Sequence, residues 1–117
     1  MIIMGIDPGL ASTGIGIIEE KRPEGWRILS QEDVGTSRRQ ALPERLERIY
    51  KLVVRGIEDY QPDVVAVESI FFARNVRSAV MMAHGRGAAL LAASNHGIQI
   101  AEYSPLEIKQ SVVGKGR

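Results

Sequence analysis

Residues 2–19, IIMGIDPGLASTGIGIIE, contain two short apolar runs with a connection rich in glycine, proline and serine between them. The runs cover residues 2–7 and 14–19, and this pattern predicts two strands joined by a turn. A single acid, Asp7, closes the first run directly before a proline and a glycine. A carboxylate in that place is either a turn former or a ligand at the end of a strand.

Further elements follow where the hydrophobic spacing changes. Residues 26–36 are a third, more polar strand candidate. From residue 42 to residue 60 apolar side chains recur at steps of three and four, which predicts an amphipathic helix. Pro43 suits the first turn of this helix, and Pro62 suits its end.

The second half of the chain alternates strands and helices. Residues 63–69, DVVAVES, are nearly continuously apolar and β-branched, as in a strand that is buried on both faces. Residues 75–95 form a second helix, with Gly97 as its left-handed cap. Residues 98–103 are a fifth strand, and residues 104–113 open a third helix.

This order of elements predicts an α/β protein with a mixed five-stranded sheet. The first three strands are expected to be antiparallel, and the later two to lie parallel to the first, joined through helices by right-handed crossovers. A length of 117 residues, of which 44% are hydrophobic, fits a single domain with one core over residues 1–117.

The composition excludes several classes of protein. No apolar run approaches the roughly 20 residues of a membrane-spanning helix, and the first residues lack the basic and long apolar parts of a secretion signal. The absence of cysteine excludes disulfides, a thiolate zinc site and a cysteine nucleophile. We therefore expect a cytoplasmic protein without a membrane partner.

The net charge of +1 conceals an uneven distribution along the chain. Residues 1–68 carry 12 acids and 9 bases, whereas residues 69–117 carry 2 acids and 6 bases. No acid occurs between Ser69 and Ala101. Such asymmetry indicates either a polyanionic partner or a solvated basic face.

Two acids are predicted to meet at one edge of the sheet. Asp7 ends the first strand and Glu68 ends the fourth, and parallel neighbours lie about 4.8 Å apart. Ligands bind beyond the carboxyl ends of parallel strands, and a divalent cation would remove the repulsion between the carboxylates. Their hard oxygen atoms suit Mg²⁺ or Mn²⁺. The alternatives are a turn-forming Asp7 and a solvated Glu68; Glu102, at the end of the fifth strand, is either an outer ligand or solvated.

Four segments together resemble the RuvC-type Holliday junction resolvases in order and spacing. They are GIDPGLASTG (5–14), VVAVESIFFARN (64–75), AVMMAHGRGAALLAASNHG (79–97) and YSPLEIKQSVVGKGR (103–117). The resemblance implies a ribonuclease-H-like fold and a homodimer that acts on four-way DNA junctions. It further implies a magnesium-dependent endonuclease that cuts two strands of like polarity symmetrically. It leaves open whether a branch-migration helicase complex is a further partner.

The resemblance also assigns roles to individual residues. Asp7 and Glu68 resemble the first two metal-binding carboxylates of the family, Phe71 its base-contacting aromatic residue and Lys109 one of its DNA-contacting lysines. Residues near Phe71 and Lys109 in the sequence are further candidates for DNA binding: Arg74, Asn75, Arg77, Lys115 and Arg117.

Phe71 and Phe72 cannot both point into one core if this segment is extended, because neighbouring side chains then face opposite ways. One ring is therefore expected to be exposed, beside Arg74 and Arg77, where it can stack on an unpaired base. The resemblance selects Phe71 for this role and leaves Phe72 for the core.

Small residues repeat along the second helix. Ala79, Ala83 and Gly87 recur at steps of four, as do other glycines and alanines of this segment. One face of the helix must pack on its own sheet, and the other is free for a partner. The resemblance favours a two-fold dimer through Ala79, Ala83 and Gly87, whose symmetry matches a junction with two equivalent cutting sites.

The resemblance is incomplete at the C-terminus. Resolvases of this type continue beyond the position of Arg117, through a helix that bears the remaining catalytic acids. The 117-residue chain alone is therefore expected to be inactive, as a fragment or truncated form. Two alternatives stay open: a catalytically incomplete junction-binding module of the same fold, and an ATP-binding relative that uses DPGLASTG on phosphates.

Overall fold

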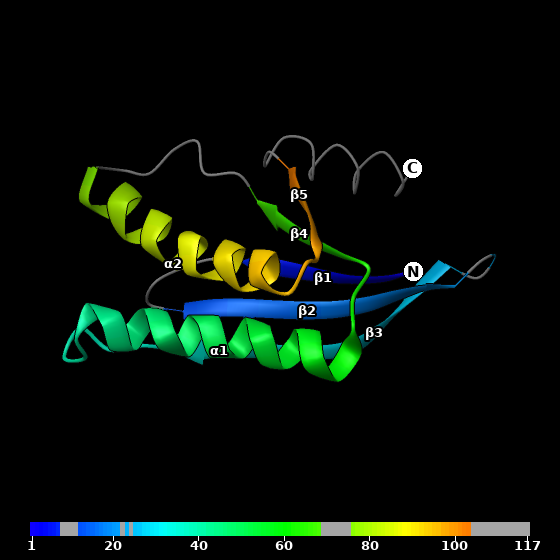
Figure 1. Cartoon of the computed structure of the whole chain (residues 1–117), viewed down its shortest axis with the longest axis horizontal. Coiled ribbons are helices and arrows are strands. Elements are labelled where there is room, and N and C mark those ends of the chain that lie inside the picture. Colours follow the sequence, from blue (N-terminus) through cyan, green and yellow to red (C-terminus); the bar gives the residue numbers. More distant parts are fainter. Residues whose placement is uncertain (8–11, 22, 24, 69–75, 104–117) are drawn as a thin grey trace.

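The computed structural model describes residues 1–7, 12–21, 23, 25–68 and 76–103. Figure 1 shows the elements that these residues form, a sheet with two long helices packed against it. In chain order they are β1 (Ile2–Asp7), β2 (Ser12–Lys21), β3 (Gly25–Gly35), α1 (Leu42–Tyr60), β4 (Val64–Glu68), α2 (Val76–Asn95) and β5 (Gln99–Tyr103).

The strands form a mixed sheet in the order β3-β2-β1-β4-β5. β1 pairs antiparallel with β2, and β2 with β3. β1 pairs parallel with β4, and β4 with β5. This topology confirms the predicted α/β fold with its antiparallel start and its two later parallel strands. The predicted third helix, residues 104–113, lies outside the described residues.

The β2–β3 hairpin is longer than the sequence pattern indicates. β2 extends to both sides of the predicted 14–19 because its whole length pairs with β3, from Ser12 opposite Gly35 to Lys21 opposite Gly25. A register shift between Ile17 and Ile18 interrupts the ladder. Such a bulge bends the strand and increases its twist.

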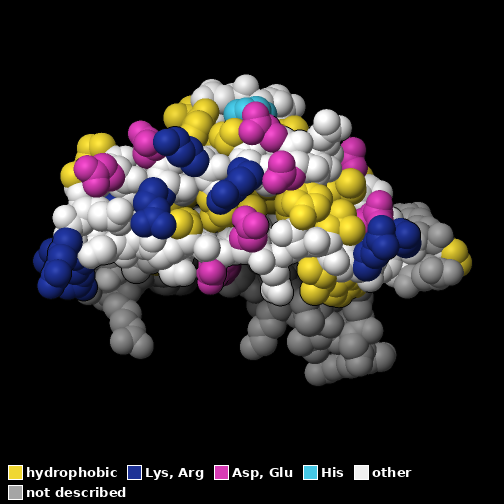
Figure 2. Space-filling view, turned by 90° about the horizontal axis from the view of Figure 1, so that it is seen from below, with side chains coloured by type: hydrophobic (Ala, Val, Ile, Leu, Met, Phe, Trp, Pro, Cys, Tyr) yellow, Lys and Arg dark blue, Asp and Glu magenta, His cyan; other side chains and the backbone are white. Residues whose placement is uncertain are grey.

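α1 has the boundaries that its apolar spacing predicts. A proline occupies its first turn, and Gln61 ends it in the left-handed conformation (φ 49°), with its N–H donating to the carbonyl oxygen of Ile57 at 2.8 Å. Ile49, Val53 and Ile57 of its apolar stripe are buried, and Leu46 and Tyr60 are half-buried. Figure 2 views the molecule from the side on which α1 lies in Figure 1, and there Lys and Arg side chains are interspersed with Asp and Glu. This is the expected solvent side of an amphipathic helix.

The core lies between the sheet and the two helices, which cover the same face of the sheet (Figure 1). A Cβ atom added at Gly56 of α1 would lie 2.6 Å from Cε of Met4 on β1, which shows how closely this helix approaches the sheet. The apolar strand side chains buried on this face are Met4, Ile6, Ile15, Ile17, Val65 and Val67.

The prediction that β4 is buried on both faces is wrong. Val65 and Val67 are buried, but Val64, Ala66 and Glu68 are only half-buried. The reason is that α1 and α2 both pack on the face to which Val65 and Val67 point. The continuous apolar sequence of this strand thus corresponds to one covered face and one more open face.

α2 packs through small residues. Gly85, Ala89, Ala92 and Ala93 are buried, and Gly97 follows the helix with φ +68°, as predicted for its cap. No helix in the described part of the chain is long and apolar enough to cross a membrane.

Candidate functional site

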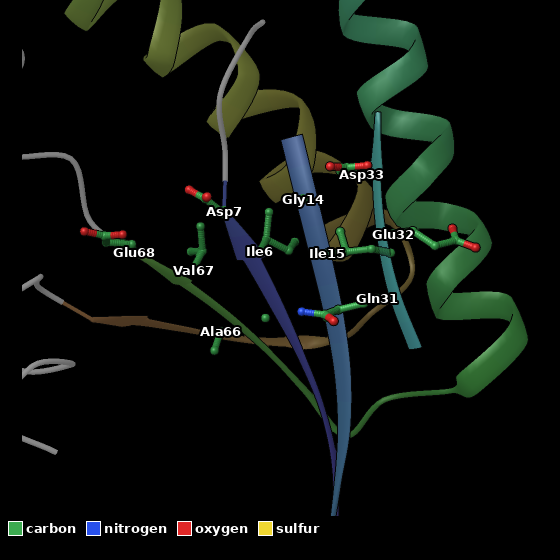
Figure 3. A pocket seen from close by; sticks show the side chains of 12 residues that line it. Ile6, Asp7, Gly14, Ile15, Gln31, Glu32, Asp33, Ala66, Val67 and Glu68 are labelled. Carbon is green, nitrogen blue, oxygen red and sulfur yellow. The ribbon is translucent and has the colours of Figure 1, made fainter. Parts of the chain in front are cut away.

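Asp7 and Glu68 are brought to the same edge of the sheet by the pairing of β1 with β4. Ile6 lies opposite Val67 in the parallel register, and each of these residues is followed by an acid that ends its strand. Ile6 and Val67 are buried beneath the helices. Because side chains alternate along a strand, Asp7 and Glu68 project to the opposite face, as Figure 3 shows.

A groove begins at these acids and runs along the more open face of the sheet (Figure 3). Its volume is about 690 Å³, and β1, β2, β3 and β4 all contribute residues to its lining. The groove is open because small residues on this face do not fill it with side chains. A Cβ atom built at Gly16 would have nothing within 4 Å. The other small residues of the lining are Gly5, Gly14 and Ala66.

A third acid, Asp33, lies across the groove from Asp7. The register places Gly14 opposite Asp7 on one side and opposite Asp33 on the other, so a residue without a side chain separates the two acids. Asp33 lies at the groove margin in Figure 3, whereas the side chain of Glu32 is directed toward α1. Asp33 could not be recognised from the sequence, because the antiparallel register of the β2–β3 hairpin is what brings it near Asp7.

Glu102 does not join these acids. It pairs in register with Val67, whose side chain points to the helices. Its Oε1 atom forms an ion pair with Nη2 of Arg86 on α2 at 2.9 Å. The alternative of Glu102 as an outer ligand beside Asp7 and Glu68 therefore lacks support from the geometry, since the side chain is on the other side of the sheet.

The donor set at the sheet edge fits a hydrated magnesium ion. Asp7 is exposed and Glu68 half-buried, so both carboxylates can be reached. Mg²⁺ usually binds through one or two carboxylates, with water and substrate phosphate oxygens filling its other positions. No group of three or more potential ligands occurs within residues 1–7, 12–21, 23, 25–68 and 76–103. The two carboxylates thus match a site that substrate would complete.

The other predicted site residues are distributed unevenly. Arg77 is exposed in the first turn of α2. Ala83 and Gly87 are exposed on α2, and Ala79 is half-buried. The remaining DNA-binding candidates lie outside the described residues and stay predictions: Phe71, Arg74, Asn75, Lys109, Lys115 and Arg117.

Comparison with known proteins identifies the family. The family model described as crossover junction endodeoxyribonuclease RuvC matches residues 3–117. The protein of that description from Alkaliphilus oremlandii is 48% identical over 117 residues, which are all of this chain and 71% of the relative. The one from Ruminiclostridium cellulolyticum is 42% identical, with all of this chain and 70% of the relative covered.

A solved structure of similar fold supports this assignment. It is the structure of T. thermophilus RuvC in complex with a Holliday junction substrate, with a TM-score of 0.90 and 32% sequence identity. The match covers 98% of this chain and 73% of that one. With a family match over nearly its whole length and relatives of this identity, the chain belongs to the RuvC family of crossover junction endodeoxyribonucleases.

Proposed function

We propose that this protein is a structure-specific endonuclease that resolves four-way (Holliday) DNA junctions in recombination and repair. The observation that carries the proposal is the placement of Asp7 and Glu68 at the ends of neighbouring parallel strands, in a chain of the RuvC family. The fold is that of T. thermophilus RuvC, a protein whose structure was solved with such a junction. Ligands of parallel sheets bind at this edge.

Asp7 and Glu68 are the proposed ligands of Mg²⁺, for which Mn²⁺ can substitute. When bound, the ion would activate water and stabilise charge on the scissile phosphate. The two carboxylates supply oxygen atoms and negative charge at one edge of the sheet, because each ends a strand of the same ladder. Without a cation, the same charges would repel a DNA phosphate. We therefore expect the site to bind DNA in a position suitable for cleavage only when the cation is bound.

DNA contacts are proposed for residues that follow β4 and for the C-terminal segment. Arg77, exposed on the first turn of α2, can reach a phosphate. By the resemblance of the motifs, Phe71 is the proposed stacking residue at the junction. The other proposed contacts are Arg74, Asn75, Lys109, Lys115 and Arg117.

A homodimer through α2 is the proposed assembly. Val80 and Leu91 of this helix are 47% and 55% exposed although both are apolar. Ala83, Gly87 and Leu91 line a groove of about 410 Å³ between α1 and α2. An apolar exposed helix face of this kind indicates an interaction surface. A two-fold dimer would present two copies of the Asp7–Glu68 site to two equivalent strands.

Substitution of the two acids tests the proposed site. We expect Asp7→Asn and Glu68→Gln to lower the rate of junction cleavage more than about 100-fold, because even an outer partner of a metal ligand is worth about 10- to 100-fold. Junction affinity should stay within about threefold, since phosphate contacts supply most of it. Gel assays of cleavage and binding measure both quantities. Cleavage at the rate of the unsubstituted protein in either variant would contradict the assignment.

A junction-binding module that does not cut is the second candidate for the 117-residue chain by itself. The specific observation is that no group of three or more metal-ligand side chains occurs among the described residues. Two carboxylates and a substrate phosphate still leave several of the six positions around magnesium to water, so the ion is positioned less firmly than in a site with more protein ligands. A purified chain of residues 1–117 should therefore bind junctions without nicking them, whereas magnesium-dependent nicking would argue against this candidate.

A further inference from the structure

Arg86 connects α2 to the carboxyl ends of two strands. Its Nη2 atom lies 2.9 Å from Oε1 of Glu102 on β5. Its Nε atom donates a hydrogen bond of 3.4 Å to the backbone carbonyl oxygen of Glu68, the last residue of β4. The side chain of Arg86 is 18% exposed, so the guanidinium is held in a mostly buried place.

An arginine suits this place for a geometric reason. The guanidinium carries five N–H donors in a rigid planar fork, so it can bind a carboxylate and a carbonyl oxygen at the same time. A lysine carries a compact charge on a flexible stem and would keep the ion pair more easily than the second contact. The two contacts together fix the end of β4 relative to β5 and α2.

Arg86 approaches Glu68 from the helix side of the sheet. Arg86 contacts the backbone carbonyl of Glu68, whereas the side chain of Glu68 lies at the groove together with Asp7 (Figure 3). The carboxylate oxygens of Glu68 are therefore not used by Arg86 in the contacts that the structure gives. Arg86 can therefore affect the position of the Glu68 carboxylate only through the backbone of Glu68.

We propose that Arg86, held by Glu102, is a positioning residue that fixes the end of β4 so that Glu68 and Asp7 present their carboxylates to one divalent cation. This inference rests on the proposed metal site. It assigns a role to Glu102 as well, as the anchor of the arginine and not as a ligand.

The sign of the effect on metal binding separates this role from simple electrostatics. Removal of a positive charge near a cation site should by Coulomb's law strengthen cation binding. Loss of positioning should weaken it, because the two carboxylates would no longer be held for the same ion. A variant without the charge at residue 86 therefore gives opposite results under the two explanations.

Calorimetric titration of the full chain with Mn²⁺ in the absence of DNA tests the proposal. We expect Arg86→Met, which keeps much of the side-chain length, to weaken Mn²⁺ binding at least about tenfold, as for other residues that orient metal ligands. Arg55→Met, the same change at an exposed arginine of α1, is the matched control and should leave Mn²⁺ affinity unchanged. Unchanged or tighter Mn²⁺ binding by Arg86→Met would overturn the inference.

Two further variants guard against a folding defect. Arg86→Lys keeps the charge and should weaken Mn²⁺ binding by less than Arg86→Met. Glu102→Gln should weaken it as well, through the lost anchor of Arg86 and through the lost negative charge, so it supports the proposal only together with Arg86→Lys. If Arg86→Met does not fold, these two variants decide, and affinity equal to that of the unsubstituted protein in both would refute the proposal. Circular dichroism checks folding in each case.

Two more measurements separate the alternatives. Junction affinity without metal should be unchanged in Arg86→Met. A loss of affinity with a salt dependence reduced by about one phosphate contact would make Arg86 a DNA ligand instead.

Mn²⁺ binding by Asp7→Asn serves as a benchmark for the metal site itself. If Asp7→Asn leaves Mn²⁺ binding unchanged, the proposed metal site fails. If only Arg86→Met leaves it unchanged, the positioning role fails alone.

Discussion

The two helices lie on the same face of the sheet but bury opposite kinds of side chain. α1 buries a stripe of large apolar residues, Ile49, Leu52, Val53 and Ile57. α2, which is nearly equal in length, buries Gly85, Ala89, Ala92 and Ala93. The outer side of α1 is charged, with exposed residues that include Glu44, Glu47, Arg48, Lys51, Arg55, Glu58 and Asp59. α2 exposes Val76, Val80 and Leu91.

This difference indicates that the helices have different functions in the fold. The large side chains of α1 supply most of the apolar area that the helices remove from water, and burial of such area is the main stabilising contribution to a core. The small residues of α2 allow close approach but contribute little area. Three of its larger apolar side chains, Val76, Val80 and Leu91, lie on the outside, where a partner could cover them. Met81 and Leu90 pack partly against the core. α1 is thus expected to stabilise the single chain, and α2 the assembly.

The same leucine-to-alanine change in the two helices should give the largest contrast. Leu52 of α1 is 3% exposed, and Leu52→Ala should lower the free energy of unfolding by about 2–5 kcal/mol, from lost burial and the cavity left behind. Leu91 of α2 is 55% exposed, and Leu91→Ala should lower it by less than about 1 kcal/mol in the separated chain. Urea unfolding at low protein concentration measures both. Equal losses would refute the division of roles.

A charge placed on the outer face of α2 should act on assembly and not on folding. Ala83 is exposed, so Ala83→Glu has room in the single chain. At a dimer interface the carboxylate would be desolvated, and we expect the dissociation constant to rise at least tenfold, which is about 1.4 kcal/mol. Sedimentation at several concentrations measures the constant, with Ala83→Ser as a control of small volume. An unchanged dimer would exclude this face as the interface.

A matched pair of glycines extends the comparison to backbone packing. At Gly56 of α1 an added Cβ atom would lie 2.6 Å from Cε of Met4 and 3.0 Å from Cδ1 of Ile15, whereas at Gly87 of α2 nothing lies within 4 Å. Gly87→Ala should therefore stabilise the separated chain by about 0.5–1 kcal/mol, the helix-propensity gain of alanine over glycine.

Gly56→Ala should instead be destabilising, by up to about 2.5 kcal/mol net. The Met4 and Ile15 side chains must move, which costs about 1–3 kcal/mol in a packed core and offsets the same propensity gain. Thermal unfolding of the two variants side by side gives the sign of each change. Stabilisation by both substitutions would show that the α1–sheet contact has free space.

The features that could be predicted from the sequence depend on local patterns and on the order of the elements. The features that could not be predicted depend on contacts between distant parts of the chain. α1 could be predicted because its apolar and charged positions differ strongly along one helical period. The pairing of Asp7 with Glu68 could be predicted because a parallel neighbour is implied by the order of the elements. Both inferences need only the local pattern and the topology.

The failures all depend on which face of the sheet is covered and on the register across it. The sequence of β4 predicts burial on both faces, because apolar residues such as Val64 and Ala66 occur on its open face as well. Asp33 comes near Asp7 only through the pairing of both strands with Gly14. The contact of Arg86 with Glu68 joins residues from different elements, and no periodicity in the sequence contains it.

The smallest expected effect concerns the charged side of α1. Nζ of Lys51 lies 2.9 Å from Oε1 of Glu47, one turn apart, and its hydrogen bond and positive charge hold the pKa of Glu47 below its ordinary value. A carboxylate with a lowered pKa in the folded state stabilises that state above the pKa of the unfolded chain, and this contribution is lost as the pH falls through the folded pKa. Both side chains are exposed, so the contribution is small.

Glu47→Gln should therefore lower the melting temperature slightly at neutral pH, and the difference should vanish in acid below the pKa of Glu47. Glu44→Gln, at another exposed acid of α1, is the control for a general change of charge. A carboxyl NMR titration of Glu47 should have its midpoint below the ordinary value for glutamate. A midpoint above that value, or a difference in melting temperature that persists in acid, would show that the Glu47–Lys51 pair does not stabilise the helix.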